Sequence, residues 1–67
     1  MIINFFSTDD GVELACLELP RVPMKDEFVA IDGRVQRVRS VVWTVKKNKL
    51  VAIQVLVRNL QPNEGMM

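Results

Sequence analysis

The sequence lacks the side chains from which most catalytic and metal sites are built. Its 67 residues contain one cysteine, Cys16, and no histidine or tyrosine. One cysteine cannot form a disulfide within the chain, and without histidine no Cys/His set is present to hold zinc. We interpret Cys16 as a small buried hydrophobic residue, because no histidine exists to activate its thiol. The acids Asp26, Glu27 and Asp32 are better explained as turn residues than as catalytic groups. We therefore expect a non-enzymatic protein that uses no cofactor and no metal.

Long apolar runs and helical patterns are absent as well. The longest apolar run, around Leu50–Ile53, is much shorter than a bilayer span. The first residues lead directly to Asp9 and Asp10, without the basic segment that begins a signal peptide. No segment has helical periodicity, and β-branched and aromatic residues dominate the apolar runs. We expect a cytoplasmic, all-β chain with no substantial helix and no membrane segment.

The small size and high apolar content of the chain predict self-association. A chain of 67 residues is close to the size at which a single core becomes thin. Disulfides and metals are excluded as supplements, whereas the apolar fraction is 49%. We expect apolar surface that a second copy or another protein covers.

The first two apolar runs, Ile2–Ser7 and Val12–Leu19, read as a hairpin. We predict a three-residue loop, Asp9-Asp10-Gly11, with Gly11 in the left-handed region. A two-residue Asp10-Gly11 turn is the alternative, but it matches apolar residues less well. The preferred register pairs Phe5 with Ala15, Ile3 with Leu17 and Phe6 with Leu14. Both faces of this hairpin are then apolar, so both require cover.

The middle of the chain reads as a stiff connector followed by a second hairpin. Two prolines within Leu19–Pro23 favour extended backbone. Asp32-Gly33 is a strong signal for a tight turn between Phe28–Ile31 and a long strand that runs to Val45. Apolar residues slip twice from strict alternation along this strand, which predicts a bulge near Arg39-Ser40 and a sheet that closes on itself.

The last hairpin is predicted to turn through Lys46-Lys47-Asn48, with Asn48 left-handed. This register pairs Trp43 with Val51, Val41 with Ile53 and Arg39 with Val55. One face of the ribbon is the predicted core: Val41, Trp43, Val45, Val51, Ile53, Val55 and Val57. The opposite face carries Leu50, Ala52 and Leu56 and is too apolar to be freely solvated.

The run from Pro23 through Phe28–Arg34 to Val41-Val42-Trp43, followed by Val51–Val57, resembles the SH3-like small barrels. It is similar in particular to short barrel proteins of phages and prophages. The resemblance implies a binding or assembly module, in the host cytoplasm if the chain is phage-derived, and it transfers no catalytic residues. We predict a small antiparallel SH3-like barrel of about five strands in residues 1–60, followed by a flexible tail in residues 61–67.

Charge is divided along the chain. Residues 1–32 hold seven acidic and two basic side chains, whereas residues 33–67 hold seven basic and one acidic. Either the two halves neutralise one another within the barrel, or a basic surface meets an acidic partner. That partner is a nucleic acid or the acidic half of a neighbouring copy.

Two function hypotheses follow. The first is an interaction or assembly protein that forms homo-oligomers and binds another protein. Its candidate interface consists of apolar residues on the two hairpins: Ile3, Phe5, Leu17, Leu50, Ala52 and Leu56. The alternative is a nucleic-acid-binding barrel, with these candidate phosphate contacts: Arg34, Arg37, Arg39, Lys46, Lys47 and Lys49. The alternative ranks second because small barrels that bind nucleic acid usually expose aromatic residues for stacking, whereas this chain has no tyrosine and Trp43 is predicted to face the core.

Overall fold

A computed structural model describes residues 1–60 of the chain, which form five strands and no helix. The strands are β1 (Ile2–Ser7), β2 (Glu13–Glu18), β3 (Phe28–Ile31), β4 (Arg34–Lys46) and β5 (Lys49–Asn59). They make one sheet in the order β2-β1-β5-β4-β3, with parallel pairing of β1 to β5 and antiparallel pairing elsewhere. The prediction of an all-β fold is therefore confirmed. The predicted tail, residues 61–67, lies outside the described part of the chain.

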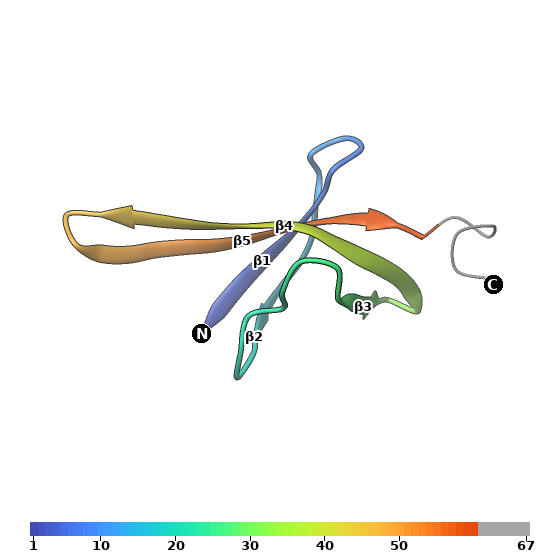
Figure 1. Cartoon of the computed structure of the whole chain (residues 1–67), viewed down its shortest axis with the longest axis horizontal. Coiled ribbons are helices and arrows are strands. Elements are labelled where there is room, and N and C mark those ends of the chain that lie inside the picture. The colour runs from blue at the N-terminus through green and yellow to red at the C-terminus, as the bar shows by residue number, and fades with distance from the viewer. Residues whose placement is uncertain (61–67) are drawn as a thin grey trace.

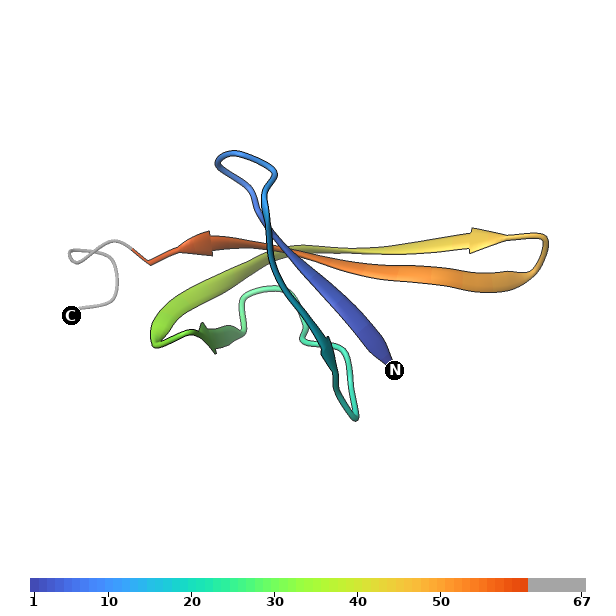
Figure 2. The ribbon, with the colours of Figure 1, turned by 180° about the vertical axis from the view of Figure 1, so that it is seen from behind.

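The sheet curls into a half-barrel instead of closing. Figures 1 and 2 show the hairpin of β1 and β2 crossing the hairpin of β4 and β5, with the β2–β3 connection below the crossing in both views. The connection carries Val22 and Pro23, which are both buried. Backbone bonds extend the edge of β3 toward the connection, because Val38 accepts from the N–H of Asp26 and donates to the carbonyl of Glu27.

The core lies on the concave face of this half-barrel. Its fully buried side chains come from three neighbouring strands: Ile3, Phe5, Val38, Ile53, Val55 and Val57. The parallel register places Ile3 beside Ile53 and Phe5 beside Val55, so alternate residues of β1 and β5 face the same side. Val22 from the connection and Ile31 from β3 complete the cluster. The predicted core positions Ile53, Val55 and Val57 are confirmed.

The N-terminal hairpin has two of its three predicted pairs. Phe5 pairs with Ala15 and Ile3 with Leu17, and Gly11 is left-handed with φ of 73°. Phe6 faces Glu13 instead of Leu14, because the register shifts between Phe5 and Phe6. The N–H of Ser7 donates to the carbonyl of Val12, so the loop spans residues 8–11 and is longer than predicted. The bulge at Leu14 absorbs this extra residue.

Both predicted features of the middle hairpin are confirmed. Ile31 pairs with Arg34 around a two-residue turn in which Asp32 and Gly33 have φ of 52° and 81°. Positive φ at both central residues is the conformation that fits the right-handed twist of a hairpin. Farther along β4, Val38 pairs with Val57 and Ser40 with Leu56, which leaves Arg39 as the extra residue of a bulge.

The last hairpin differs from its prediction. Asn48 is left-handed as predicted, with φ of 64°, but Lys47 is also left-handed with φ of 52°. The turn therefore contains two residues, and Lys46 pairs with Lys49. A second bulge forms at Val51, and the turn and the bulge together pair Trp43 with Ile53 instead of Val51.

The distal part of this hairpin, residues 39–52, projects from the sheet, and we call it the arm. β3 pairs with β4 only at Arg34–Arg37, and β1 pairs with β5 only at Ile53–Val57. We call the rest of the described chain the body. The arm extends to the left of the body in Figure 1 and gives the molecule a longest dimension of 44 Å. Because no third strand of residues 1–60 pairs along the arm, Trp43, Val45 and Val51 are exposed, and the prediction that they are core residues is wrong. The predicted burial of Cys16 is also wrong, since this residue is exposed on β2.

Candidate interaction surface

Five large apolar side chains on the arm are exposed, and four of them share one face: Trp43, Val45, Leu50 and Val51. Trp43 pairs with the core residue Ile53 and therefore faces the concave side, as does Val45 two residues later. Leu50 is directly opposite Val45, and Val51 is the bulged residue beside it. Their exposed fractions are 52%, 62%, 51% and 60% in chain order. We call these four residues the arm face, and it continues the surface of the core beyond the point where the body ends.

The opposite, convex face of the hairpin is partly apolar. Ala52 and Leu56 are half-buried there, and Val42 is 42% exposed. Gln54 and Ser40 share this face because Val42 pairs with Gln54 and Ser40 with Leu56. The predicted second face is thus present, except that the bulge at Val51 moves Leu50 to the arm face.

The six predicted interface residues are consequently dispersed. Ile3 and Phe5 have no exposed surface and belong to the core, so they cannot contact a partner of the folded chain. Leu17 lies on the edge strand β2 and is 44% exposed. Leu50 is part of the arm face, whereas Ala52 and Leu56 lie on the convex face. What sequence reasoning missed is Trp43, together with Val45 and Val51. The length of β4, 13 residues against 4 in β3, is the structural reason that these side chains are uncovered.

The arm also concentrates positive charge. Lys46, Lys47 and Lys49 surround its tip and Arg39 lies at its base, and all four are exposed. No acidic residue occurs between Gly33 and Leu60. The other two predicted phosphate contacts lie on the body, where Arg34 follows the β3–β4 turn and Arg37 forms an ion pair. The structure therefore brings three of the six predicted phosphate contacts together, the lysines at the tip, whereas Arg34, Arg37 and Arg39 lie apart from them.

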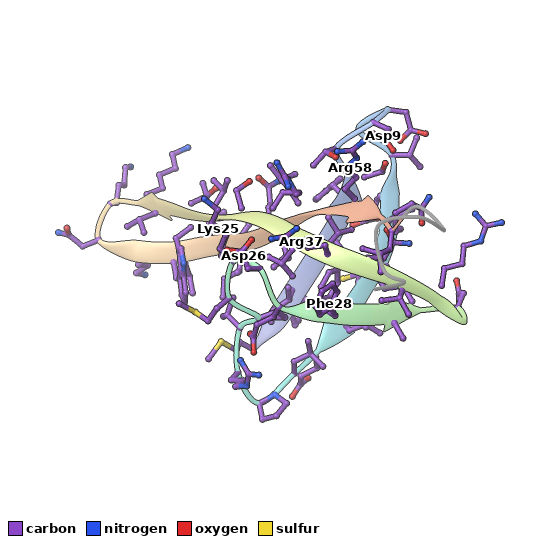
Figure 3. The ribbon with its side chains drawn as sticks, turned by 45° about the vertical axis from the view of Figure 1, so that its right-hand side comes forward. Asp9, Lys25, Asp26, Phe28, Arg37 and Arg58 are labelled. Atoms are coloured by element: carbon purple, nitrogen blue, oxygen red, sulfur yellow. The ribbon has the colours of Figure 1, made fainter. Side chains whose placement is uncertain are left out.

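Two ion pairs hold the β2–β3 connection. Arg37 Nη2 lies 2.9 Å from Asp26 Oδ1, and Figure 3 shows these side chains together beside β4. Arg21 donates from both terminal nitrogens to the two carboxylate oxygens of Glu27, each at 2.9 Å. The bonds from Arg21 and from the Met24 N–H lower the pKa of Glu27 to about 2. Asp26 and Glu27 thus have structural roles, which agrees with their interpretation as turn residues.

The remaining acidic residues of the N-terminal half gather mainly on the first hairpin. Asp9 and Asp10 lie in its loop, and Glu13 and Glu18 begin and end β2. Asp10 Oδ1 accepts from the Val12 N–H, and Glu13 accepts from Asn4 Nδ2. Exposed apolar side chains occur among these carboxylates, with Val12 54% exposed. β2 is the last strand of the sheet, so this acidic and apolar strip lies along an open sheet edge.

A small cavity of about 210 Å³ opens at the mouth of the half-barrel, between β2 and β3. It is lined by six residues: Leu14, Ile31, Asp32, Arg34, Gln36 and Asn59. Gln36 is buried, and its Nε2 donates to Asn59 Oδ1 at 2.6 Å. The cavity is smaller than usual ligand pockets, and its buried amide is already bonded, so it does not define a ligand site.

Within residues 1–60, no three Cys, Asp or Glu side chains are grouped as a metal site would require. The same part of the chain has no helix of the length and apolarity needed to cross a membrane. Comparison of the chain with models of protein families, with curated proteins and with solved structures found no match. The arm face, the three lysines at the tip of the arm and the acidic edge along β2 remain as the candidate binding surfaces.

Proposed function

We propose that this chain is a non-enzymatic interaction module of the SH3-like small-barrel class that forms homo-oligomers and acts by binding protein. The observation that carries the proposal is the arm face, on which four large apolar side chains are each at least half exposed. Burying a side chain such as Val or Leu contributes about 1.5–3 kcal/mol relative to leaving it in water. A projecting ribbon that keeps four of them exposed is typical of a surface that a partner covers.

The shape of the arm supports the same proposal. Exposed apolar residues that occur singly are normal on a protein surface, but these four are adjacent and share one face. A two-stranded ribbon on its own is only marginally stable in water, so an arm that outruns its sheet gains stability when another surface packs on it. Trp43 supplies the kind of large, rigid side chain that dominates the binding energy of protein interfaces.

The proposal is tested by measuring molar mass by light scattering across a concentration series. The wild type is expected to form a defined oligomer, and Val45→Glu on the arm face is expected to be monomeric. Val35→Glu is the matched control, because Val35 is an exposed valine on the same strand but on the body. A wild type that stays monomeric at every concentration, or equal loss of assembly in both variants, contradicts the proposal.

Nucleic-acid binding is a second candidate function, which the exposure of Trp43 favours. This side chain lies on the same ribbon as Lys46, Lys47 and Lys49, so a base could stack on it while lysines contact phosphates. A two-stranded ribbon also fits the major groove of duplex DNA.

Fluorescence anisotropy with labelled single-stranded DNA, RNA and duplex DNA separates the two candidates. Binding through the arm should weaken steeply as salt rises, and Lys46→Gln with Lys49→Gln should reduce the salt dependence by about one to two charges. Arg34→Gln, on the body, is the matched control. Affinity that is absent, or unaffected by both arm substitutions, contradicts the second candidate.

A further inference from the structure

We propose that the partner of the arm is a second copy of this chain, whose edge strand β2 lies antiparallel along the outer edge of β4. This inference rests on the proposed function, because it names the partner and the register of the same arm. Three observations carry it: the charges of the two segments, the spacing of those charges, and the open backbone edges on both.

The charges exclude simple pairing of two arms and favour pairing of an arm with β2. Each arm carries Arg39 and the three tip lysines and no acidic residue, so two arms placed side by side repel. β2 carries Glu13 and Glu18, and its loop adds Asp9 and Asp10. The two ion pairs of the described chain use Asp26 and Glu27, and they involve none of these four carboxylates.

The spacing of charge and apolar residues matches between the segments. On β2, four uncharged residues separate the acids Glu13 and Glu18, which are therefore about 17 Å apart along a strand. On β4, six uncharged residues separate the bases Arg39 and Lys46, which are therefore about 23 Å apart. The long basic side chains can cover the difference of about 3 Å at each end. An antiparallel placement sets Lys46 near Glu13 and Arg39 near Glu18.

Both segments present an open backbone edge. Among residues 1–60, the hydrogen bonds to the outer edge of β4 come from β3 and from Asp26 and Glu27, and they end at Val38. β2 pairs with β1 on one side and is the terminal strand on the other. An added strand satisfies such an edge through main-chain bonds, and side-chain pairs then set the register. In this register Leu17 lies on the concave side near Val41 and Trp43 of the other copy, where it extends the apolar arm face.

Charge reversal tests the assignment by mixing two variants. Arg39→Glu with Lys46→Glu and Lys49→Glu makes the arm acidic, and Glu13→Lys with Glu18→Lys makes β2 basic. Each variant alone is expected to be monomeric at concentrations at which the wild type assembles, because its own arm and β2 then carry like charges. An equimolar mixture is expected to form heteromeric complexes, because each arm again meets a β2 of opposite charge. Circular dichroism checks that both variants keep the sheet.

The outcomes separate this inference from the proposed function. A monomeric wild type overturns both. A wild type that assembles while either variant also assembles alone, or while the mixture stays monomeric, overturns the pairing with β2 and leaves a homo-oligomer of another geometry. Assembly that appears only when nucleic acid is added overturns the pairing in favour of the second candidate function.

A cross-link supplies an independent test, because Cys16 is the single cysteine and is exposed on β2. The proposed register places Cys16 near Val42 of the other copy, and both side chains lie on the convex face. Within one chain these residues occupy one row of the sheet, through Asn4 and Gln54, and are three strand spacings or about 14 Å apart. That separation exceeds the reach of a disulfide, so Val42→Cys can link to Cys16 only between copies.

Mild oxidation of Val42→Cys is expected to give a covalent dimer whose linked peptides contain residues 16 and 42. Val35→Cys, on the same strand but on the body, is the matched control and is expected to give no such link. The proposed register is overturned if the Val42→Cys dimer contains only like pairs, 42 to 42 or 16 to 16, or if the control links to Cys16 equally well.

Discussion

Glu27 joins three parts of the β2–β3 connection through one carboxylate. Its oxygens accept hydrogen bonds from both terminal nitrogens of Arg21, and Oε1 also accepts a hydrogen bond from the Met24 N–H at 2.6 Å. The backbone at Asp26, the preceding residue, has φ of 74°, in the left-handed region that aspartate adopts more readily than most residues. The bonds of Glu27 are thus a local reason why the connection turns here and places Val22 under the sheet.

The lowered pKa of Glu27 predicts a pH dependence of stability. Its folded value is about 2, whereas an unperturbed glutamate has a pKa of about 4.3. A depressed folded pKa stabilises the fold above the unfolded value, and this stabilisation is lost as pH falls from about 4.3 toward about 2. Urea unfolding of Glu27→Gln is expected to show a smaller loss of stability than the wild type over this range. Glu18→Gln is the control, and a wild-type acid limb that Glu27→Gln leaves unchanged contradicts the prediction.

Truncation of Phe5 is predicted to destabilise the fold much more than truncation of Trp43. Phe5 has no exposed surface, so Phe5→Ala should cost about 3–5 kcal/mol. Trp43 is 52% exposed, so Trp43→Ala should change the free energy of unfolding of the monomer by about 1 kcal/mol or less. Chemical unfolding at low protein concentration, monitored by circular dichroism, measures both. Equal destabilisation by the two variants contradicts the exposed position of Trp43.

The turn between β4 and β5 and the bulge at Val51 together set the register of the arm. A loop one residue longer pairs Trp43 with Val51, whereas the two-residue turn and the bulge at Val51 together pair it with Ile53. Asn48 is a residue type that predicts one left-handed position. The second left-handed residue is Lys47, a residue type that rarely adopts positive φ. The sequence therefore supports two registers, and the twist of the hairpin favours the shorter turn.

Lys47→Asn is predicted to stabilise the hairpin. Asparagine tolerates the left-handed region better than lysine, so the free energy of unfolding should rise by about 0.5–1 kcal/mol. Lys46→Asn is the matched control, because Lys46 ends β4 in the paired region and should bring no gain. Thermal and urea unfolding measure both variants. A destabilised Lys47→Asn, with Lys46→Asn unchanged or stabilised, indicates the three-residue loop.

The same comparison shows how much of the fold could be predicted from the sequence. Turns with a distinctive residue were predictable: Gly11 is left-handed, Asp32-Gly33 forms the tight turn, and the broken alternation locates the bulge at Arg39. Bulges at Leu14 and Val51 leave no such signature, since each lies in a run where both faces are apolar. The exposure of Trp43 was not predictable either, because it depends on how far β1 and β3 reach along their partners.

At the scale of the whole molecule, the division of charge along the chain becomes a division in space. Ion pairs of Asp26 with Arg37 and of Glu27 with Arg21 neutralise charge where the connection meets the body. The arm remains basic and the edge at β2 remains acidic, so a net charge of +1 conceals two complementary surfaces. Contact between different surfaces of identical chains is heterologous, and it yields a closed ring or dimer only if the rotation between copies closes.

Hydrogen exchange measured at low and high protein concentration tests this view of the molecule. The centres of β1 and β5 surround the buried residues Phe5 and Val55, so their amides should exchange slowly at both concentrations. Amides of the arm and of β2 have an open edge in the single chain, so they should exchange quickly when dilute and slowly when concentrated. In Arg39→Glu with Lys46→Glu and Lys49→Glu the effect of concentration should vanish while protection of β1 and β5 remains. Protection that rises over the arm but not over β2 would assign the arm to a different surface, whereas exchange independent of concentration would indicate that copies of the chain do not associate.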